Sequence, residues 1–345
     1  MTSVYFKEIR QNTASKTSDI ARQLLERIVS EERIRLNEEI PLKIHMGEKG
    51  NVTFVKPENY DGIIGFLKEE GIRTCYMETS VLYGGQRFRR DVHLKTAKEH
   101  GFTQLPVTIA DGEFGDEYTE VEINKKHFKK HKIAKAFAGY DQLLVLSHFK
   151  GHMLAGFGGA IKQLSMGFSS KGGKLAMHMG IKPRIINRKC KKCHKCEKRC
   201  NEHAITIDER SYIDHAKCVG CGACVAICPN KAVSIMSLKG VLHFIGIGNP
   251  FREKLVEGAY AAQKGKRNIY INFAVNITRG CDCVSRQMKP LIDDVGVFAS
   301  VDPVAIDKAC FDICKAKGKS FRGSEQLAYA EKIGLGTQEY ELVSV

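Results

Sequence analysis

The chain has 345 residues, and its 54 Lys and Arg against 39 Asp and Glu give a formal net charge of +15. This length predicts about two domains, and 43% hydrophobic residues can fill a sizeable core, which excludes a disordered chain and a peptide-sized scaffold. No apolar run approaches the roughly 18 residues of a membrane-spanning helix, and the first thirty residues lack the apolar segment of a secretory signal. We therefore expect a cytoplasmic protein without a membrane span.

Strands alternate with helices in the first half of the sequence. In chain order, the pattern predicts a helix over 19–32, a strand over 42–46, a helix over 61–70, a strand over 73–78, a helix over 90–100, a strand over 107–110, a helix over 126–137 and a strand over 142–148. Such alternation is typical of a mostly parallel sheet that helices cover on both faces.

The alternation stops at a glycine-rich stretch, 151–180, which reads as a loop. After a cysteine-rich segment it returns with a helix over 250–263, strands over 269–275 and 295–300, and a helix over 303–316 that Asp302 begins as N-cap. The predicted fold is α/β, with an inserted α+β module. The domains expected are 1–182 (α/β, first part), 183–237 (module) and 238–345 (α/β, second part).

Eight of the thirteen cysteines form two C-x2-C-x2-C-x3-C repeats, the arrangement of bacterial ferredoxins with two [4Fe-4S] clusters. Three thiolates of one repeat wrap one cluster, and the fourth comes from the other repeat. One cluster is therefore assigned to Cys190, Cys193, Cys196 and Cys228, and the other to Cys218, Cys221, Cys224 and Cys200. Short β-rich segments, 204–207 and 232–235, follow the repeats. The alternative is a pair of structural zinc sites, but two complete repeats favour iron and sulfide.

The segment 182–199 holds nine Lys or Arg and a single acid, Glu197. Positive charge around the module favours docking of an acidic redox carrier, a ferredoxin or flavodoxin, or of a partner oxidoreductase. A solvated surface without a partner is an equal alternative. Nucleic-acid binding is disfavoured, because the run lacks the interleaved aromatic residues of a base-stacking surface.

A second site is expected beyond the strand 142–148, because ligands of parallel sheets gather at the carboxyl ends of strands. The glycine-rich stretch satisfies neither nucleotide-binding fingerprint. His148, His152 and Lys162 are the candidate catalytic residues, and Cys281 and Cys283 are candidate ligands of a further metal. The alternative is ordinary hydrogen-bonded histidines and unligated thiols. His178 could also converge there. Lys150 and Lys174 could add positive charge for an anionic small-molecule substrate.

The chain resembles the family called domain of unknown function 362, in its iron–sulfur form from anaerobic bacteria and archaea. Besides the cysteine repeats, the matching segments are HMGEKGN (45–51), LYGG (82–85), SHFKGH (147–152), GFGGAIK (156–162), CDC (281–283), DPVAID (302–307) and GSEQL (323–327). The resemblance covers nearly the whole length. It implies an α/β domain that carries an inserted two-cluster ferredoxin module, and it supplies no substrate.

These observations predict an iron–sulfur protein whose two [4Fe-4S] clusters pass single electrons, as an oxidoreductase coupled to a site in the α/β domain. One alternative is a dedicated ferredoxin-like electron carrier, in which the α/β part is a scaffold for docking. A weaker alternative is a basic nucleic-acid-binding protein with structural clusters.

Overall fold

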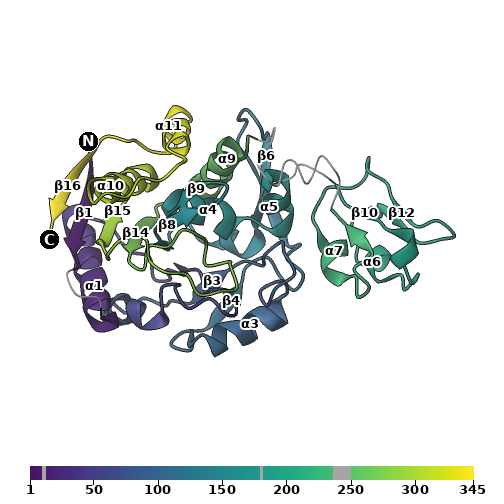
Figure 1. The fold of residues 1–345 in the computed structure, drawn as a ribbon, viewed down its shortest axis with the longest axis horizontal. Coiled ribbons are helices and arrows are strands. Elements are labelled where there is room, and N and C mark those ends of the chain that lie inside the picture. Colours follow the sequence, from purple (N-terminus) through teal and green to yellow (C-terminus); the bar gives the residue numbers. More distant parts are fainter. Residues whose placement is uncertain (10–12, 179–181, 236–249) are drawn as a thin grey trace.

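The structure, a computed structural model, describes residues 1–9, 13–178, 182–235 and 250–345. Its central feature is an eight-stranded sheet in the order β16-β1-β15-β14-β7-β2-β3-β4 (Figure 1). The strands are β1 (Thr2–Glu8), β2 (Leu42–Lys43), β3 (Tyr76–Glu78), β4 (Val107–Ile109), β7 (Leu144–His148), β14 (Ile269–Ala274), β15 (Gly296–Ser300) and β16 (Tyr340–Ser344).

Five neighbouring strands, from β4 to β14, run parallel, which confirms the prediction of a mostly parallel α/β sheet. Strand β15 is the exception. It pairs antiparallel with both β14 and β1, and β1 pairs parallel with β16. The first and last strands of the chain therefore extend one edge of the sheet, and neither was predicted from the sequence.

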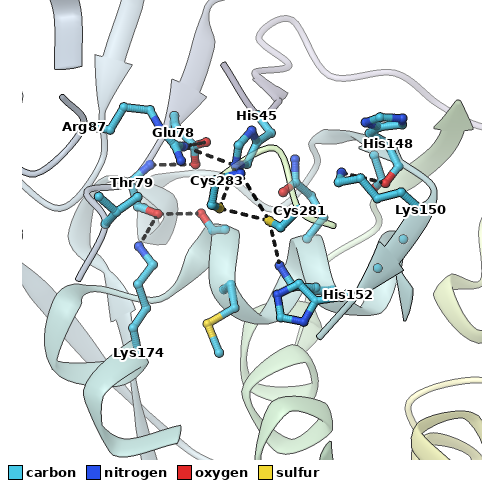
Figure 2. A pocket seen from close by; sticks show the side chains of 18 of the residues that line it. His45, Glu78, Thr79, Arg87, His148, Lys150, His152, Lys174, Cys281 and Cys283 are labelled. Carbon is cyan, nitrogen blue, oxygen red and sulfur yellow. Dashed lines mark hydrogen bonds and ion pairs between the residues drawn. The ribbon is translucent and has the colours of Figure 1, made fainter. Parts of the chain in front are cut away.

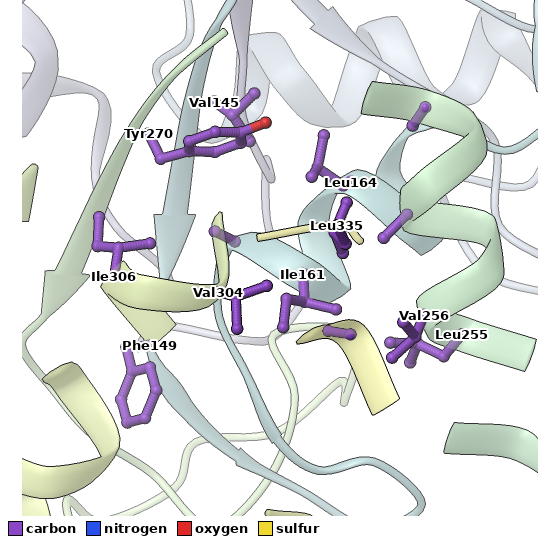
Figure 3. Packing of buried hydrophobic residues seen from close by; sticks show 14 of the residues in the cluster. Val145, Phe149, Ile161, Leu164, Leu255, Val256, Tyr270, Val304, Ile306 and Leu335 are labelled. Carbon is purple, nitrogen blue, oxygen red and sulfur yellow. The ribbon is translucent and has the colours of Figure 1, made fainter. Parts of the chain in front are cut away.

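Helices cover both faces of the sheet, and each face has its own core. Consecutive residues of β7 alternate between the cores: Leu144 and Leu146 pack on one face, and Val145 packs on the other. The first face is covered by α1 (Ala14–Glu31), α2 (Asp61–Glu69) and α3 (Arg90–Glu99). The second is covered by α4 (Ala160–Phe168), α9 (Phe251–Gln263), α10 (Pro303–Ala316) and α11 (Glu325–Lys332), whose packing Figure 3 shows.

The helix predicted over 126–137 is wrong. A hairpin of β5 (Tyr118–Glu122) and β6 (Lys130–Ala134) occupies this region, followed by a short 3₁₀ helix, Lys135–Gly139. Within β6, His131 and Ile133 point into the protein between more exposed lysines, so burial alternates with the period of two of a strand.

The prediction of a loop for the glycine-rich stretch is wrong, because the stretch forms a small hairpin and two helices. These are β8 (Lys150–His152), β9 (Gly156–Gly158), α4 and α5 (Lys171–His178). Asp307 of α10 accepts hydrogen bonds from the backbone N–H groups of Ala160 and Ile161 at 2.7 and 3.0 Å, so α4 is capped from a distant part of the chain. A local pattern cannot reveal such a cap.

The cysteine-rich segment forms a small unit at the end of the molecule opposite the two termini (Figure 1). It consists of β10 (Arg184–Ile185), α6 (Lys195–Lys198), β11 (Ile205–Thr206), β12 (Tyr212–Ile213), α7 (Ala223–Ile227) and β13 (Val233–Ser234) around its own apolar cluster. The boundary predicted after residue 237 lies outside the described residues. Within the described ranges, no helix is both long enough and apolar enough to cross a bilayer.

Candidate functional site

A pocket opens where four neighbouring parallel strands, β3, β2, β7 and β14, reach their carboxyl ends (Figure 2). Its wall contains all five residues singled out for a second site: His148, His152, Lys162, Cys281 and Cys283. The loop after β14 is held against β8 by a hydrogen bond of 2.8 Å from the Gly151 N–H group to the carbonyl of Thr278.

His178, which the sequence also suggested for this site, does not line the pocket. Its ring packs against Phe251 at 4.7 Å between ring centroids, on α9. The convergence expected from the sequence therefore holds for the residues that follow β7 and β14, but not for this histidine.

The Cys-Asp-Cys segment places two thiol groups side by side. Cys281 Sγ and Cys283 Sγ lie 3.0 Å apart, and Lys162 Nζ lies 3.9 Å from Cys281 Sγ. The contact with Cys283, aided by the Lys162 and Lys150 cations, holds the pKa of Cys281 well below its usual value, although burial opposes this. The same contact raises the pKa of Cys283. Cys281, the thiol beside Lys162, is therefore the more acidic of the two.

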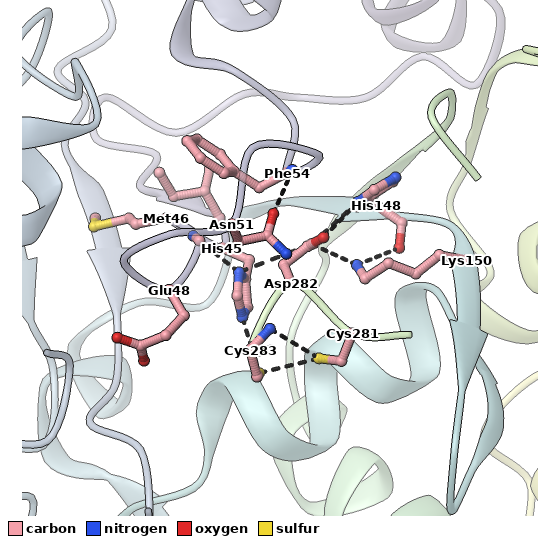
Figure 4. A network of polar contacts seen from close by, with 12 residues as sticks. His45, Met46, Glu48, Asn51, Phe54, His148, Lys150, Cys281, Asp282 and Cys283 are labelled. Carbon is pink, nitrogen blue, oxygen red and sulfur yellow. Dashed lines mark hydrogen bonds and ion pairs between the residues drawn. The ribbon is translucent and has the colours of Figure 1, made fainter. Parts of the chain in front are cut away.

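Asp282 points away from the pocket and orders the loop from behind (Figure 4). Its carboxylate lies 3.0 Å from His148 Nδ1 and 2.6 Å from Lys150 Nζ, and these two groups keep its pKa well below the usual range against the effect of burial. His148 Nε2 lies 2.7 Å from the carbonyl of Val275. Both ring nitrogens of His148 are thus engaged by the protein.

His152 differs from His148, because its Nδ1 accepts hydrogen bonds from the N–H groups of Leu154 and Ala155 at 3.3 and 3.1 Å. Burial and the nearby Lys162 cation lower its pKa well below the usual value. A neutral ring with an accepting Nδ1 carries its proton on Nε2. This nitrogen remains available as a donor.

The wall formed by β2 and β3 contains a buried charge network that sequence reasoning missed. Glu78 lies 2.9 Å from Lys43 Nζ and 3.5 Å from Arg87 Nη1, and Arg87 also lies 3.4 Å from Glu48. Burial raises the pKa of Glu78, but Lys43, His45 and Arg87 together hold it well below its usual range. Glu48 lies within the HMGEKGN segment, and the LYGG segment lies between Glu78 and Arg87 in the sequence, so these two segments of the family resemblance were the available signal.

Two lysines bring positive charge to the pocket, and within the described residues no carboxylate lies at ion-pair distance from either. Lys162 faces Cys281, and Lys174 donates to the Thr79 hydroxyl and the Ser80 carbonyl at 2.7 and 2.5 Å. Burial lowers the pKa of Lys174 to about 8. An anion bound between these lysines would gain both attractions and stabilise the charged form of Lys174.

A second cavity lies at the edge of the cysteine-rich unit. Four of the eight cysteines of the repeats line it: Cys200, Cys218, Cys221 and Cys224. Asp116, just before β5, and Tyr118, the first residue of β5, also line it, and Asp116 forms an ion pair of 2.9 Å with Arg199. Burial raises the pKa of Cys196 most, and Cys228 and Cys193 raise it further. Around the cavity, Cys200 of the first repeat lies with three cysteines of the second.

Helix α5 lies between the second cavity and the pocket. A Cβ atom added to Gly172 would lie 3.0 Å from the Cα atom of Cys221, so the helix backbone packs directly on the cysteine loop. Lys174, two residues further along α5, lines the pocket. The axial rise between these residues is roughly 3 Å.

The family model described as domain of unknown function (DUF362) matches residues 40–312. Over 47 residues, the chain is 53% identical to a Methanosarcina acetivorans protein named as one subunit of an ion-translocating oxidoreductase complex; this covers 13% of the chain and 18% of that relative. Two solved structures share low similarity. The lactate racemase apoprotein from Thermoanaerobacterium thermosaccharolyticum has 14% identity and a TM-score of 0.40, with 80% of this chain and 51% of that one covered. A Thermotoga maritima protein has 12% identity and a TM-score of 0.42, with 91% and 61% covered.

Proposed function

We propose that this chain, which belongs to the DUF362 family, is an iron–sulfur oxidoreductase acting on an anionic small molecule in the pocket. The eight cysteines of the repeats would hold two [4Fe-4S] clusters, divided as the sequence predicts. Their grouping fits this assignment, because Cys200 lines one cavity with the three leading cysteines of the other repeat. Bound clusters would supply single electrons. The partial match to an oxidoreductase subunit agrees with a redox role.

The observation that carries the proposal is the position of α5. One end of this helix packs on the loop of Cys221, and Lys174 of the same helix lines the pocket. An iron–sulfur unit that served only as a structural element would not need to lie so close to a cationic cavity. The proximity therefore favours an oxidoreductase over a carrier with a separate scaffold.

Within the pocket, Lys162 and Lys174 would bind the anionic group of the substrate. His152 would donate a hydrogen bond or a proton from Nε2, because its Nδ1 is occupied by backbone donors. His148 would act as a positioning residue, since Asp282 and the Val275 carbonyl engage both of its nitrogens. This divides the roles of the three catalytic candidates.

The test uses anaerobic protein with reduced clusters and follows their reoxidation in visible absorbance. A panel of carboxylates and phosphate esters is compared with their neutral amides and alcohols. We expect at least one anion, and none of the neutral analogues, to reoxidise the clusters, and Lys174→Met to slow this reaction. If only an acidic ferredoxin or flavodoxin reoxidises them, the chain is the dedicated electron carrier of the alternative hypothesis.

A further inference from the structure

Three potential metal ligands meet at the wall of the pocket. His45 Nε2 lies 3.3 Å from Cys283 Sγ, Cys283 Sγ lies 3.0 Å from Cys281 Sγ, and the three atoms all lie within 4.8 Å of one another. We propose that His45, Cys281 and Cys283 bind one zinc-like divalent metal ion, separate from the clusters, with a fourth position open to the pocket. The sequence suggested the two cysteines, but not His45.

The distance to the sulfur atoms distinguishes His45 from the other two histidines of the pocket, because His45 groups with Cys281 and Cys283 within 4.8 Å. Both nitrogens of His148 are engaged, and Nδ1 of His152 accepts two backbone hydrogen bonds. His45 also has protein neighbours at both nitrogens, but its Nε2 points at the sulfur atom of Cys283, 3.3 Å away (Figure 4). The loop after β2 and the loop after β14 thus supply ligands to one point, a convergence that only the sheet order creates.

The ligand set matches the metal class. Two thiolates and one imidazole suit a borderline ion, and three protein ligands with an open fourth position are typical of catalytic zinc sites. Tetrahedral zinc with Zn–S bonds of roughly 2.3 Å would separate the two sulfur atoms by roughly 3.8 Å. The thiols would therefore move apart by under about 1 Å, which a three-residue segment at the surface of a pocket accommodates.

The neighbouring groups suit an occupied site. A metal ion bound at His45 Nε2 would replace the contact of this nitrogen with Arg87 Nη1 at 3.2 Å, and the ring proton would then lie on Nδ1, which faces Gly47 N at 3.1 Å. Asp282 lies 3.9 Å from His45 Nδ1, beyond hydrogen-bond distance, and its negative charge would stabilise a metal-bound imidazole. Lys162 adjoins Cys281 and would balance negative charge on the thiolates.

The experiment loads full-length protein that already contains its clusters with one equivalent of Zn²⁺, removes free metal, and measures zinc and iron in the same sample. We expect about one zinc per chain, with an X-ray absorption spectrum of two sulfur ligands near ~2.3 Å and nitrogen or oxygen ligands near ~2.0 Å. His45→Gln and Cys283→Ser should each weaken zinc binding at least tenfold without loss of iron. Asp282→Asn should weaken it roughly 10- to 100-fold, because the loop of Cys281 and Cys283 loses the charge that His148 and Lys150 hold in place.

Cys75→Ser is the matched control, because this half-buried free thiol precedes β3, at the edge of the sheet opposite the pocket. Zinc that persists in the His45→Gln, Cys283→Ser double variant, zinc with sulfur ligands alone, or no retained zinc would each overturn the proposal. Iron content and circular dichroism of the variants separate a lost site from a lost fold. Because iron is counted independently, failure of the zinc site leaves the cluster proposal standing, and the reverse also holds.

Discussion

The buried ion pair between Lys43 and Glu78 gives a prediction whose size follows from the structure. Both side chains are almost fully buried, at 0% and 3% exposed, and their charged atoms lie 2.9 Å apart. Glu78 has a second cation at 3.5 Å, in Arg87, whereas Lys43 has no second carboxylate within ion-pair distance in the described part of the chain. Removal of Glu78 should therefore destabilise the fold more than removal of Lys43.

In Glu78→Gln, a buried lysine loses its partner, which typically costs about 3–5 kcal/mol of the free energy of unfolding. Deprotonation of Lys43 limits this cost. With an unfolded-state pKa of roughly 10.4, a neutral Lys43 costs about 1.36 × (10.4 − 7.0), or about 4.6 kcal/mol, at pH 7, and about 1.4 kcal/mol at pH 9.4. Burial already lowers the pKa of Lys43, so the unfolded state binds more protons than the folded state, and stability rises with pH. The deficit of Glu78→Gln should thus shrink towards alkaline pH.

Urea unfolding at pH 7 and pH 9.4, followed by far-UV circular dichroism, measures these differences; the chain has no tryptophan to serve as a fluorescence probe. Lys43→Met is the matched variant, and it should lose only about 1–2 kcal/mol at pH 7, because Arg87 still neutralises Glu78. Equal losses in the two variants, or a Glu78→Gln deficit that does not change with pH, would refute the reasoning.

Three further predictions concern the redox parts. Cys200→Ala should remove the cluster of the second repeat, halving the iron content and leaving one reduced paramagnetic cluster; loss of the cluster anchored by the first repeat would contradict the interleaved assignment. Charge reversal of Lys191, Lys192 and Lys195 should slow electron transfer to an acidic carrier about tenfold at low salt, as should screening by high salt, and unchanged second-order rates would assign these residues to a solvated surface. The double variant His148→Ala, His152→Ala should lower turnover at least about 100-fold with both clusters intact, and full activity would favour the electron-carrier hypothesis.

The sequence predicted the elements whose determinants are local. The apolar strand before His148 and the helix begun by Asp302 occur as expected, because Asp302 accepts hydrogen bonds from Val304 N and Ala305 N within its own segment. The sequence also predicted, for a similar reason, that His148, His152, Lys162 and the Cys281 loop converge. Residues that follow neighbouring parallel strands meet at one edge, whatever the details of the loops.

The failures have non-local causes. The helix expected over 126–137 is a strand because His131 and Ile133 pack into the core formed by α4 and α9. Helix α4 was missed because its cap, Asp307, lies almost 150 residues away. His45 was overlooked as a candidate ligand for the same reason: it lies 238 residues from Cys283, and the order of strands in the sheet, which local periodicity does not encode, brings them together.

The composition of α5 is best understood from the two sites that it separates. Two consecutive glycines within a helix cost about 1 kcal/mol each relative to alanine, and α5 carries Gly172 and Gly173. A Cβ atom at Gly172 would lie 3.0 Å from Cys221, and one at Gly173 would lie 2.5 Å from the Lys132 carbonyl of β6. The glycines therefore let one helix lie against both the cysteine loop and the hairpin of β5 and β6. The same helix directs Lys174 to the pocket, so the glycines that weaken α5 also bring the cysteine-rich unit close to the pocket, as the proposed electron transfer between them would need.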